Sequence, residues 1–190
     1  MRPVGIEVVE YSDEWPRAFE WVAERLRSAL QDVPDAQLEH VGSTSVPGLA
    51  AKPIIDIDVV VAPGDVAGAI EALRRLGYRH RGDLGIPGRE AMRAPDDEPG
   101  RNVYVCAAGT IHVRNHLGVR DVLRRRPDLR DAYAARKFAL SREPGMTIDR
   151  YVVGKSDVLG AILREAGFTE TELDVIARVN QPQAQGTINA

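Results

Sequence analysis

The sequence predicts an α/β protein in which a mixed β-sheet is flanked by helices and followed by a helical C-terminal third. Short apolar runs bounded by glycine and proline alternate with amphipathic segments in the first part of the chain, as strands and helices do. Several runs are joined by segments too short for a helical crossover, which favours antiparallel or mixed pairing. Beyond Gly109 the apolar residues recur at helical spacing. We expect one domain over 1–180, with an α/β core over 1–110, a helical part over 111–180 and a frayed tail over 181–190.

The α/β core is expected to begin with an amphipathic helix, because Phe19, Val22 and Leu26 recur at helical spacing in a charged segment. A second helix opens at Pro63 and is closed by Gly77. Between the first two strands the sequence predicts a loop or a short helical turn. Strands are expected over 36–41 and 54–61, from Tyr78, near 90–94 and over 102–107. Four helices are expected to follow, over 111–126, 128–142, 147–166 and 169–179.

The composition is that of an ordinary globular protein, with 44% hydrophobic and 28% charged residues in a chain of 190. Its net charge of −3 offers no electrostatic basis for binding duplex nucleic acid, so we expect a small-molecule partner. The single cysteine, Cys106, excludes an internal disulfide and a cysteine-rich metal site. We find no signal peptide and no apolar run of the roughly 18 residues that a membrane span needs. A cytoplasmic protein without membrane contact is expected.

Two acids, Asp56 and Asp58, interrupt the most apolar run of the chain. Residues i and i+2 of a strand share a face, so both carboxylates should leave one side of the sheet while Ile55 and Ile57 fill the other. Like charges this close are costly on a buried strand unless a cation neutralises them. A hard divalent ion coordinated by the carboxylate oxygens is the economical explanation. The alternative is a structural pair bonded to backbone N–H groups or to Arg89.

A Gly-Ser turn precedes this strand. Gly42 and Ser43, followed by Thr44 and Ser45, supply backbone N–H groups and hydroxyls that can hold a phosphate, although ordinary turn chemistry would use the same residues. The turn and the Asp-x-Asp strand together resemble the minimal signature of the nucleotidyltransferase superfamily. The longer string resembles the hallmark of the GrpB family, a branch of that fold. It comprises Glu39-His40-Val41-Gly42-Ser43-Thr44-Ser45-Val46-Pro47-Gly48-Leu49, Lys52-Pro53-Ile54-Ile55-Asp56, Gly82-Asp83-Leu84-Gly85-Ile86-Pro87-Gly88-Arg89, His116-Leu117, Arg120-Asp121, Tyr151 and Lys155.

The resemblance implies a nucleotidyltransferase fold and a Mg²⁺-dependent enzyme. Such an enzyme would bind a nucleoside triphosphate, with ATP as the first candidate, and transfer a nucleotidyl group to a small-molecule acceptor. Asp56 and Asp58 would hold the metal and act in catalysis, and residues Gly42 to Ser45 would hold the β and γ phosphates. The other candidate nucleotide-binding residues are Lys52, Arg89, His116, Arg120, Lys137 and Lys155, of which Lys137 and Lys155 match positions of the family pattern.

Enzymes of this superfamily normally carry a third carboxylate on a later strand. The corresponding run here, from Asn102 to Val105, has no acid. Either Glu90 or Asp83 completes the site, or the metal chemistry is reduced to one ion. The missing acid also favours a second interpretation, a non-catalytic accessory module on the same fold that binds a nucleotide or a CoA precursor. A nucleotide-sugar glycosyltransferase is disfavoured, because no glycine fingerprint of the Rossmann type follows a strand.

The predicted helix 111–126 carries His116 and Arg120 one turn apart on a face that is otherwise apolar. We therefore expect Arg120 to point toward the sheet, where Asp58, another acid or a phosphate would neutralise it. The arginines at 124–126 are expected to form a solvated helix end that the helix dipole favours.

Overall fold

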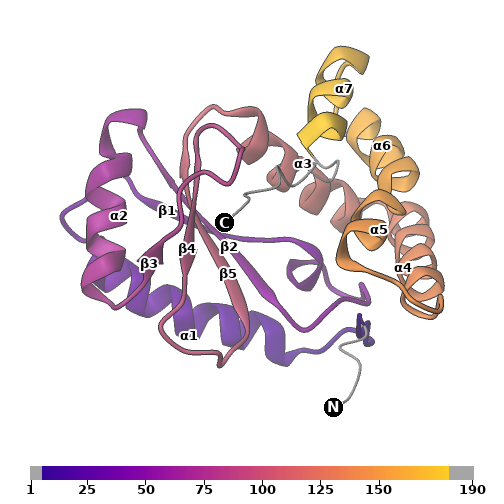
Figure 1. Ribbon diagram of the computed structural model, residues 1–190, viewed down its shortest axis with the longest axis horizontal. Coiled ribbons are helices and arrows are strands. Elements are labelled where there is room, and N and C mark those ends of the chain that lie inside the picture. Colours follow the sequence, from indigo (N-terminus) through magenta and orange to yellow (C-terminus); the bar gives the residue numbers. More distant parts are fainter. Residues whose placement is uncertain (1–5, 180–190) are drawn as a thin grey trace, which may run out of the picture.

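The structure, a computed structural model, describes residues 6–179 and is built around a five-stranded sheet in the order β1-β2-β5-β4-β3 (Figure 1). Strands β2 and β5 run parallel, whereas the other neighbouring pairs are antiparallel. The mixed sheet that the short connections predict is confirmed. The strands are β1 Gln37–Val41, β2 Ile55–Val61, β3 Arg79–His80, β4 Arg89–Arg93 and β5 Arg101–Ala107, each within one residue of its predicted range.

Two helices, α1 (Glu14–Ala29) and α2 (Val66–Arg75), pack on one face of this sheet (Figure 1). A short 3₁₀ turn, η2 (Pro63–Asp65), leads into α2. Burial of apolar side chains between the helices and the strands is the main source of stability for this half. The cluster includes Phe19, Val22 and Leu26 of α1, Ala69 and Leu73 of α2, and Ile55, Ile57, Val59, Val103 and Val105 of the sheet.

The helical C-terminal third is also confirmed. Its helices are α3 Ile111–Arg125, α4 Pro127–Ser141, α5 Ile148–Val153, α6 Ser156–Glu165 and α7 Glu170–Val179. They gather at one side of the sheet (Figure 1). Val46 and Leu49, which follow the 3₁₀ turn η1 (Ser43–Ser45), are fully buried in a cluster with residues of α3, α4 and α6. The Gly-Ser turn is thereby fixed between the sheet and the helical part.

One predicted helix, 147–166, is wrong in that the structure divides it into α5 and α6. The break lies at Gly154, where an added Cβ would come 2.6 Å from a methyl carbon of Leu140. Arg136 donates to the carbonyl oxygen of Gly154 over 2.7 Å, which satisfies a group at the end of α5. The close packing of α5 on α4 depends on this glycine, a tertiary requirement that helical spacing does not reveal. The predicted tail 181–190 lies outside the described residues.

Across residues 6–179, no helix combines the length and the apolar character that crossing a membrane requires.

Candidate active site

Strand β2 places Asp56 and Asp58 on the sheet face opposite the α1–α2 core, as the alternation predicts. Asp58 is fully buried, and Asp56 is partly exposed. Asp58 Oδ1 lacks a hydrogen-bond partner among the described residues. Burial raises the pKa of Asp56, although a hydrogen bond from Asn102 opposes this effect. A buried carboxylate oxygen without a partner is energetically costly, which marks this pair as a candidate ligand site.

Gly42 closes over the first carboxylate. Its backbone has φ 70° and ψ −174°, a conformation that is accessible in practice to glycine alone. A Cβ at this position would lie 2.1 Å from Asp56 Oδ2. Both the backbone conformation and the space therefore require glycine, and the turn of Ser43 to Ser45 starts directly beside the carboxylate.

The buried His40 connects the Gly-Ser turn to α1. His40 stacks on Phe19 with 4.6 Å between ring centroids, and its Nε2 lies 3.1 Å from Thr44 Oγ1. The Thr44 hydroxyl donates to the carbonyl oxygen of Ile54, so the Nε2–H of His40 has to donate to Thr44. Burial, together with the charges of Arg124 and Arg120, lowers the pKa of His40 to about 4. The ring is therefore neutral and acts as a fixed link between β1 and the Gly-Ser turn.

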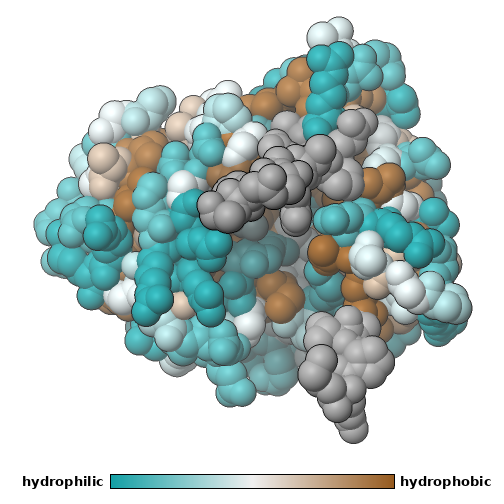
Figure 2. All heavy atoms as spheres, viewed as in Figure 1, coloured by the Kyte–Doolittle hydropathy of each residue, from teal (hydrophilic) through white to brown (hydrophobic). Residues whose placement is uncertain are grey.

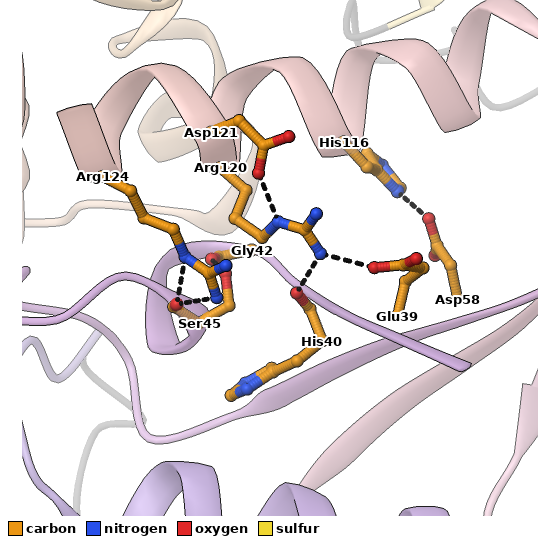
Figure 3. A network of polar contacts seen from close by, with 9 residues as sticks. All are labelled: Glu39, His40, Gly42, Ser45, Asp58, His116, Arg120, Asp121 and Arg124. Atoms are coloured by element: carbon orange, nitrogen blue, oxygen red, sulfur yellow. Dashed lines mark hydrogen bonds and ion pairs between the residues drawn. The ribbon is translucent and has the colours of Figure 1, made fainter. Parts of the chain in front are cut away.

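His116 of α3 contacts the second carboxylate. Its Nδ1 lies 2.7 Å from Asp58 Oδ2 (Figure 3). Burial acts to lower the pKa of His116, but the hydrogen bond and charge of Asp58, followed by the charge of Asp56, outweigh it and raise this pKa. A cationic His116 neutralises one oxygen of Asp58 and leaves the other free. The His116 side chain points toward the acids, and its hydrogen-bond partner is Asp58 and not a residue of the Gly-Ser turn.

No third carboxylate stands on the neighbouring strand. Asn102 lies beside Asp56 in the parallel ladder and donates to it over 2.8 Å. Glu90 points to the other face, where it bonds His80 at 2.6 Å, and Asp83 caps the backbone N–H of Gly85. Neither candidate acid thus joins Asp56 in this structure. Among residues 6–179, no group of three or more His, Cys, Asp or Glu side chains is arranged around a metal position.

Lysine occurs three times in the sequence, at positions 52, 137 and 155, and all three side chains meet near Tyr151 and Tyr133. The Nζ atoms of Lys52 and Lys155 lie 5.7 and 4.6 Å from the Tyr151 ring centroid, and that of Lys137 lies 4.6 Å from the Tyr133 ring centroid. Lys137 is buried and donates to the carbonyl oxygen of Ala50. None of these lysines forms an ion pair with an acid of the described residues.

The lysines destabilise one another's charged forms. Burial, followed by the charge of Lys155, lowers the pKa of Lys137 to about 7. Burial and the charge of Lys52 lower the pKa of Lys155 to about 8, against the attraction of Asp56. A bound anion would favour the charged forms of these amines. The Asp56 side chain is close enough to raise the pKa of Lys155, so the lysines lie beside the carboxylate pair.

Two arginines of α3, Arg120 and Arg124, donate hydrogen bonds to the segment that contains the Gly-Ser turn and do not contact the acids of β2 (Figure 3). Arg120 points inward as predicted, and its partners are Glu39 at 2.6 Å, the His40 carbonyl oxygen at 3.2 Å and Asp121 at 2.8 Å. Its anion is therefore Glu39 and not Asp58. Arg124 donates twice to the Ser45 carbonyl oxygen, over 3.1 and 2.7 Å. The prediction of a solvated helix end is wrong for Arg124, because the turn presents a carbonyl oxygen within its reach.

Arg89, the remaining candidate, starts strand β4 on the same sheet face. Its guanidinium lies 4.4 Å from the centroid of the Tyr104 ring, and its Nε is buried without a partner among residues 6–179. The structure brings Asp56, the Gly-Ser turn and the lysines together and places Arg89 farther along the sheet. Sequence reasoning missed Glu39 as the Arg120 partner and Tyr133, which lies against Ser43. The spacing of Tyr133 and Lys137 by one helical turn was the available signal.

The fold and the site define an α/β protein in which paired carboxylates of a mixed sheet lie beside a Gly-Ser turn and near a cluster of lysines. Comparison with known proteins identifies the family. The family model described as "GrpB protein" matches residues 5–165, and the chain belongs to the GrpB family. A UPF0157 protein of Halalkalibacterium halodurans is 36% identical over 87% of this chain and 84% of its own length.

The fold is also found in solved structures. The crystal structure of the conserved protein GrpB from Enterococcus faecalis has a TM-score of 0.73 and 33% identity, and the match covers 84% of this chain and 96% of that one. The Cid1 poly(U) polymerase gives a TM-score of 0.46 at 16% identity, over 69% of this chain and 45% of that one. The mixed sheet flanked by helices that the sequence resemblance implies is present.

Proposed function

We propose that this protein is a nucleotidyltransferase-like enzyme that binds a nucleoside triphosphate with Mg²⁺ and transfers the nucleotidyl group to a small acceptor. The observation that carries the proposal is that a carboxylate pair with an unsatisfied oxygen lies near lysines that form no ion pair. Asp58 Oδ1 is buried without a partner among the described residues, and Asp56 lies close enough to Lys155 to attract its charge. The three lysines gather near Tyr151 and Tyr133. A complex of a metal ion with a polyphosphate would supply a cation for the carboxylates and anionic phosphates for the lysines.

The donor set fits a hard divalent cation. Asp56 and Asp58 offer oxygen ligands, and the buried Asp58 Oδ1 without a partner among the described residues is the specific sign of a missing ligand. Bound Mg²⁺, or Mn²⁺, would neutralise phosphate charge and polarise the α-phosphorus. With two carboxylates and no third acid, the protein itself provides few ligands, so phosphate oxygens and water would have to complete the coordination.

The polyphosphate would lie across the turn. Lys52, Lys137 and Lys155 would hold the β and γ phosphates, and the hydroxyl of Ser43 and the backbone of the turn would hydrogen-bond the same groups. An anion beside Lys137 and Lys155 would raise their lowered pKa values, since it favours the charged amines. Arg120 and Arg124 would act indirectly, because they fix the segment that carries Gly42 and Ser45.

In the transfer step, the acceptor oxygen or nitrogen forms a bond to the α-phosphorus while the bond from that phosphorus to the bridging oxygen breaks. Pyrophosphate leaves with the bonding electrons of that bridge and is held by the lysines. One of the carboxylates takes the acceptor proton and later gives it to water. Positioning and charge stabilisation would therefore provide most of the acceleration.

A thermal-shift screen tests the proposal. Each of the four common nucleoside triphosphates is added with and without Mg²⁺, and the midpoint of unfolding is measured. At a ligand concentration 100-fold above Kd, binding adds about 2.7 kcal/mol to the free energy of unfolding, which corresponds to roughly 5–10 °C for a chain of this size. ATP is the first candidate. If no triphosphate raises the midpoint in the presence of Mg²⁺, the proposal fails.

The missing third acid favours a second candidate, a non-catalytic accessory module that binds a nucleotide or a CoA precursor in the same pocket. Asn102 stands beside Asp56 in the ladder, where an acid would have supplied another metal ligand. The two candidates differ in turnover. Binding of Mg²⁺ and triphosphate without pyrophosphate release, across a panel of hydroxyl and amine acceptors, would support the accessory module.

A further inference from the structure

The sheet face that carries the two acids continues across three more strands, where it becomes strongly basic. We use the word row for residues that lie side by side on neighbouring strands. In one row, Asn102 on β5 lies beside Asp56 on β2. Arg93, one residue beyond the Met92–Val103 pair, comes next on β4, and Arg79 lies directly opposite Arg93 on β3. Residues paired in this way present their side chains to the same face. The row therefore runs from a carboxylate to two arginines.

The adjoining rows repeat this pattern. Asp58 is followed by Tyr104 and Ala91, and Arg81 donates its backbone N–H to the Ala91 carbonyl oxygen. Arg89 lies opposite Cys106 one row farther on. Four arginines thus share this face: Arg79, Arg81, Arg89 and Arg93. None of them forms an ion pair with an acid of residues 6–179.

This arrangement is unfavourable without a ligand, because like charges directly opposite each other destabilise an antiparallel pair. Arginines with an acid within reach form ion pairs in other parts of the described chain, as in Arg114 with Glu172 and Arg164 with Glu170. Figure 2 shows hydrophilic side chains gathered over β3 and β4 on this side of the molecule. Four arginines that form no ion pair with an acid of the described residues thus lie together on this face, and an anion that is not part of the protein would neutralise them.

A cavity of about 510 Å³ lies over these strands. Arg81, Leu84 and Arg93 line it together with Asn102 and Tyr104, so it adjoins the row of Asp56. Two acids also line it. Asp96 is already paired with Arg101 at 2.7 Å, which leaves Asp97 as the single acid against Arg81 and Arg93. The cavity has room for a small molecule and reaches Asn102, whose side chain donates to Asp56.

We propose that this cavity binds the acceptor and that the acceptor carries an anionic group, a phosphate monoester or a carboxylate, held by Arg81 and Arg93. The inference rests on the proposed function and names the substrate class for it. Arg93 is two strands from Asp56, on the order of 10 Å across the sheet. The attacking hydroxyl or amine would lie beside Asp56, and the anionic group would lie at the far end of the same molecule. Forked arginine donors suit phosphate and carboxylate oxygens.

The test measures binding of small anions by calorimetry to the full-length protein. The probes are ribose 5-phosphate with ribose as its neutral control, and gluconate with glucose as its neutral control. The two pairs distinguish phosphate from carboxylate recognition. We expect one anion to bind and its neutral partner to bind roughly tenfold more weakly or not at all. In Arg81→Gln/Arg93→Gln that affinity should fall by roughly tenfold or more, with binding of Mg²⁺ and ATP changed less than about twofold.

Arg75→Gln, an exposed arginine at the end of α2, is the matched control and should leave both affinities unchanged. The double variant removes like charges, so we expect it to fold, and circular dichroism checks this. The proposal is overturned if neither anion binds better than its neutral control, or if the double variant binds it as the parent does. A uridine oligonucleotide that binds more tightly than both anions and is lost in the double variant would also overturn it.

Failure of the proposed function would look different. If the parent protein binds ribose 5-phosphate or gluconate through Arg81 and Arg93 but binds no triphosphate, the anion-binding cavity is supported and the proposed nucleotidyl transfer is overturned. If it binds triphosphates but neither anion, the proposed function is supported and the anion-binding cavity is overturned. Lys52→Gln serves as the converse variant, since it should weaken triphosphate binding while anion binding at the cavity is retained.

Discussion

Two charged regions of this protein meet at the Gly-Ser turn and differ in how their charges are satisfied. In the first, Arg120 and Arg124 of α3 make close contacts with Glu39, Asp121 and backbone carbonyl oxygens (Figure 3). In the second, the lysine cluster has no acidic partner among the described residues, and Asp58 keeps an unbonded oxygen. The two regions contain residues that look equivalent in the sequence.

The difference separates structural charges from binding charges. Arginine with its five fixed donors can be satisfied inside a protein by carbonyl oxygens and one acid. Burying the Lys137 amine beside Lys155 is unfavourable for stability, and the lowered pKa values of these two lysines record that cost. We infer that α3 holds the turn in place and that the lysines and acids receive the ligand. Each of the following substitutions tests one side of this division.

The largest effect is expected for Asp56→Asn. Loss of this carboxylate should abolish binding of triphosphate with Mg²⁺, because the metal would keep a single acidic ligand. Stability without ligand should not fall and should rise slightly near neutral pH. The reason is that burial raises the pKa of Asp56, and a carboxyl with a raised pKa lowers stability above its unfolded value. Thermal unfolding with and without Mg²⁺ and ATP measures both effects. Unfolding of the variant in metal-free buffer would show that Asp56 is structural.

Gly42→Ala should affect both regions. The positive φ and the contact of the new Cβ with Asp56 Oδ2 should together lower the free energy of unfolding by about 1–3 kcal/mol. The displaced carboxylate should also weaken triphosphate binding. Chemical denaturation and calorimetry give the two values. Gly68→Ala, on α2 with no atom within 4 Å of an added Cβ, is the control and should be neutral or slightly stabilising. A Gly42→Ala variant as stable as the parent would contradict the turn geometry.

Arg120→Ala should lower the free energy of unfolding, and it should affect triphosphate binding only indirectly. The Arg120 side chain is 14% exposed and pairs with Glu39, so its removal leaves a partly buried acid without this partner and costs about 1–3 kcal/mol. Arg125→Ala, on the exposed side of the same helix, should change stability by less than about 0.5 kcal/mol. Denaturation midpoints compare the two variants. Equal effects would mean that the inward face of α3 is wrongly assigned.

Much of this fold was predictable from the sequence because it depends on local patterns. Apolar alternation placed both acids on one face of β2, and the Gly-Ser turn stood next to them along the chain. The identity of each charge partner depends on tertiary distances instead. Whether Arg120 contacts Glu39 or Asp58 depends on where α3 lies along the strands of the sheet. Arg124 points inward because the Ser45 carbonyl oxygen lies within its reach. The break at Gly154 similarly follows from contact with Leu140.

The gathering of the lysines was harder to foresee. Lys52, Lys137 and Lys155 lie far apart in sequence, and each is ordinary in its own segment. Their meeting requires that α4 and the α5–α6 break pack against the loop before β2. The rarity of lysine in a chain with 25 basic residues was a visible signal. It indicates a site where a compact point charge is needed and the forked arginine is not.

The most direct test of the central claim is a pH titration of the lysine side chains by NMR, in protein labelled with ¹³C on lysine alone. With three lysines in the sequence, three sets of signals report on this site. Without ligand, Lys137 should titrate with a pKa of about 7 and Lys155 with a pKa of about 8. Between these values and the unfolded pKa, the unfolded chain binds more protons, so stability should rise with pH while triphosphate affinity falls. Mg²⁺ with ATP should move both pKa values upward. Lysines that titrate at their ordinary pKa and do not respond to Mg²⁺ with ATP would contradict the account.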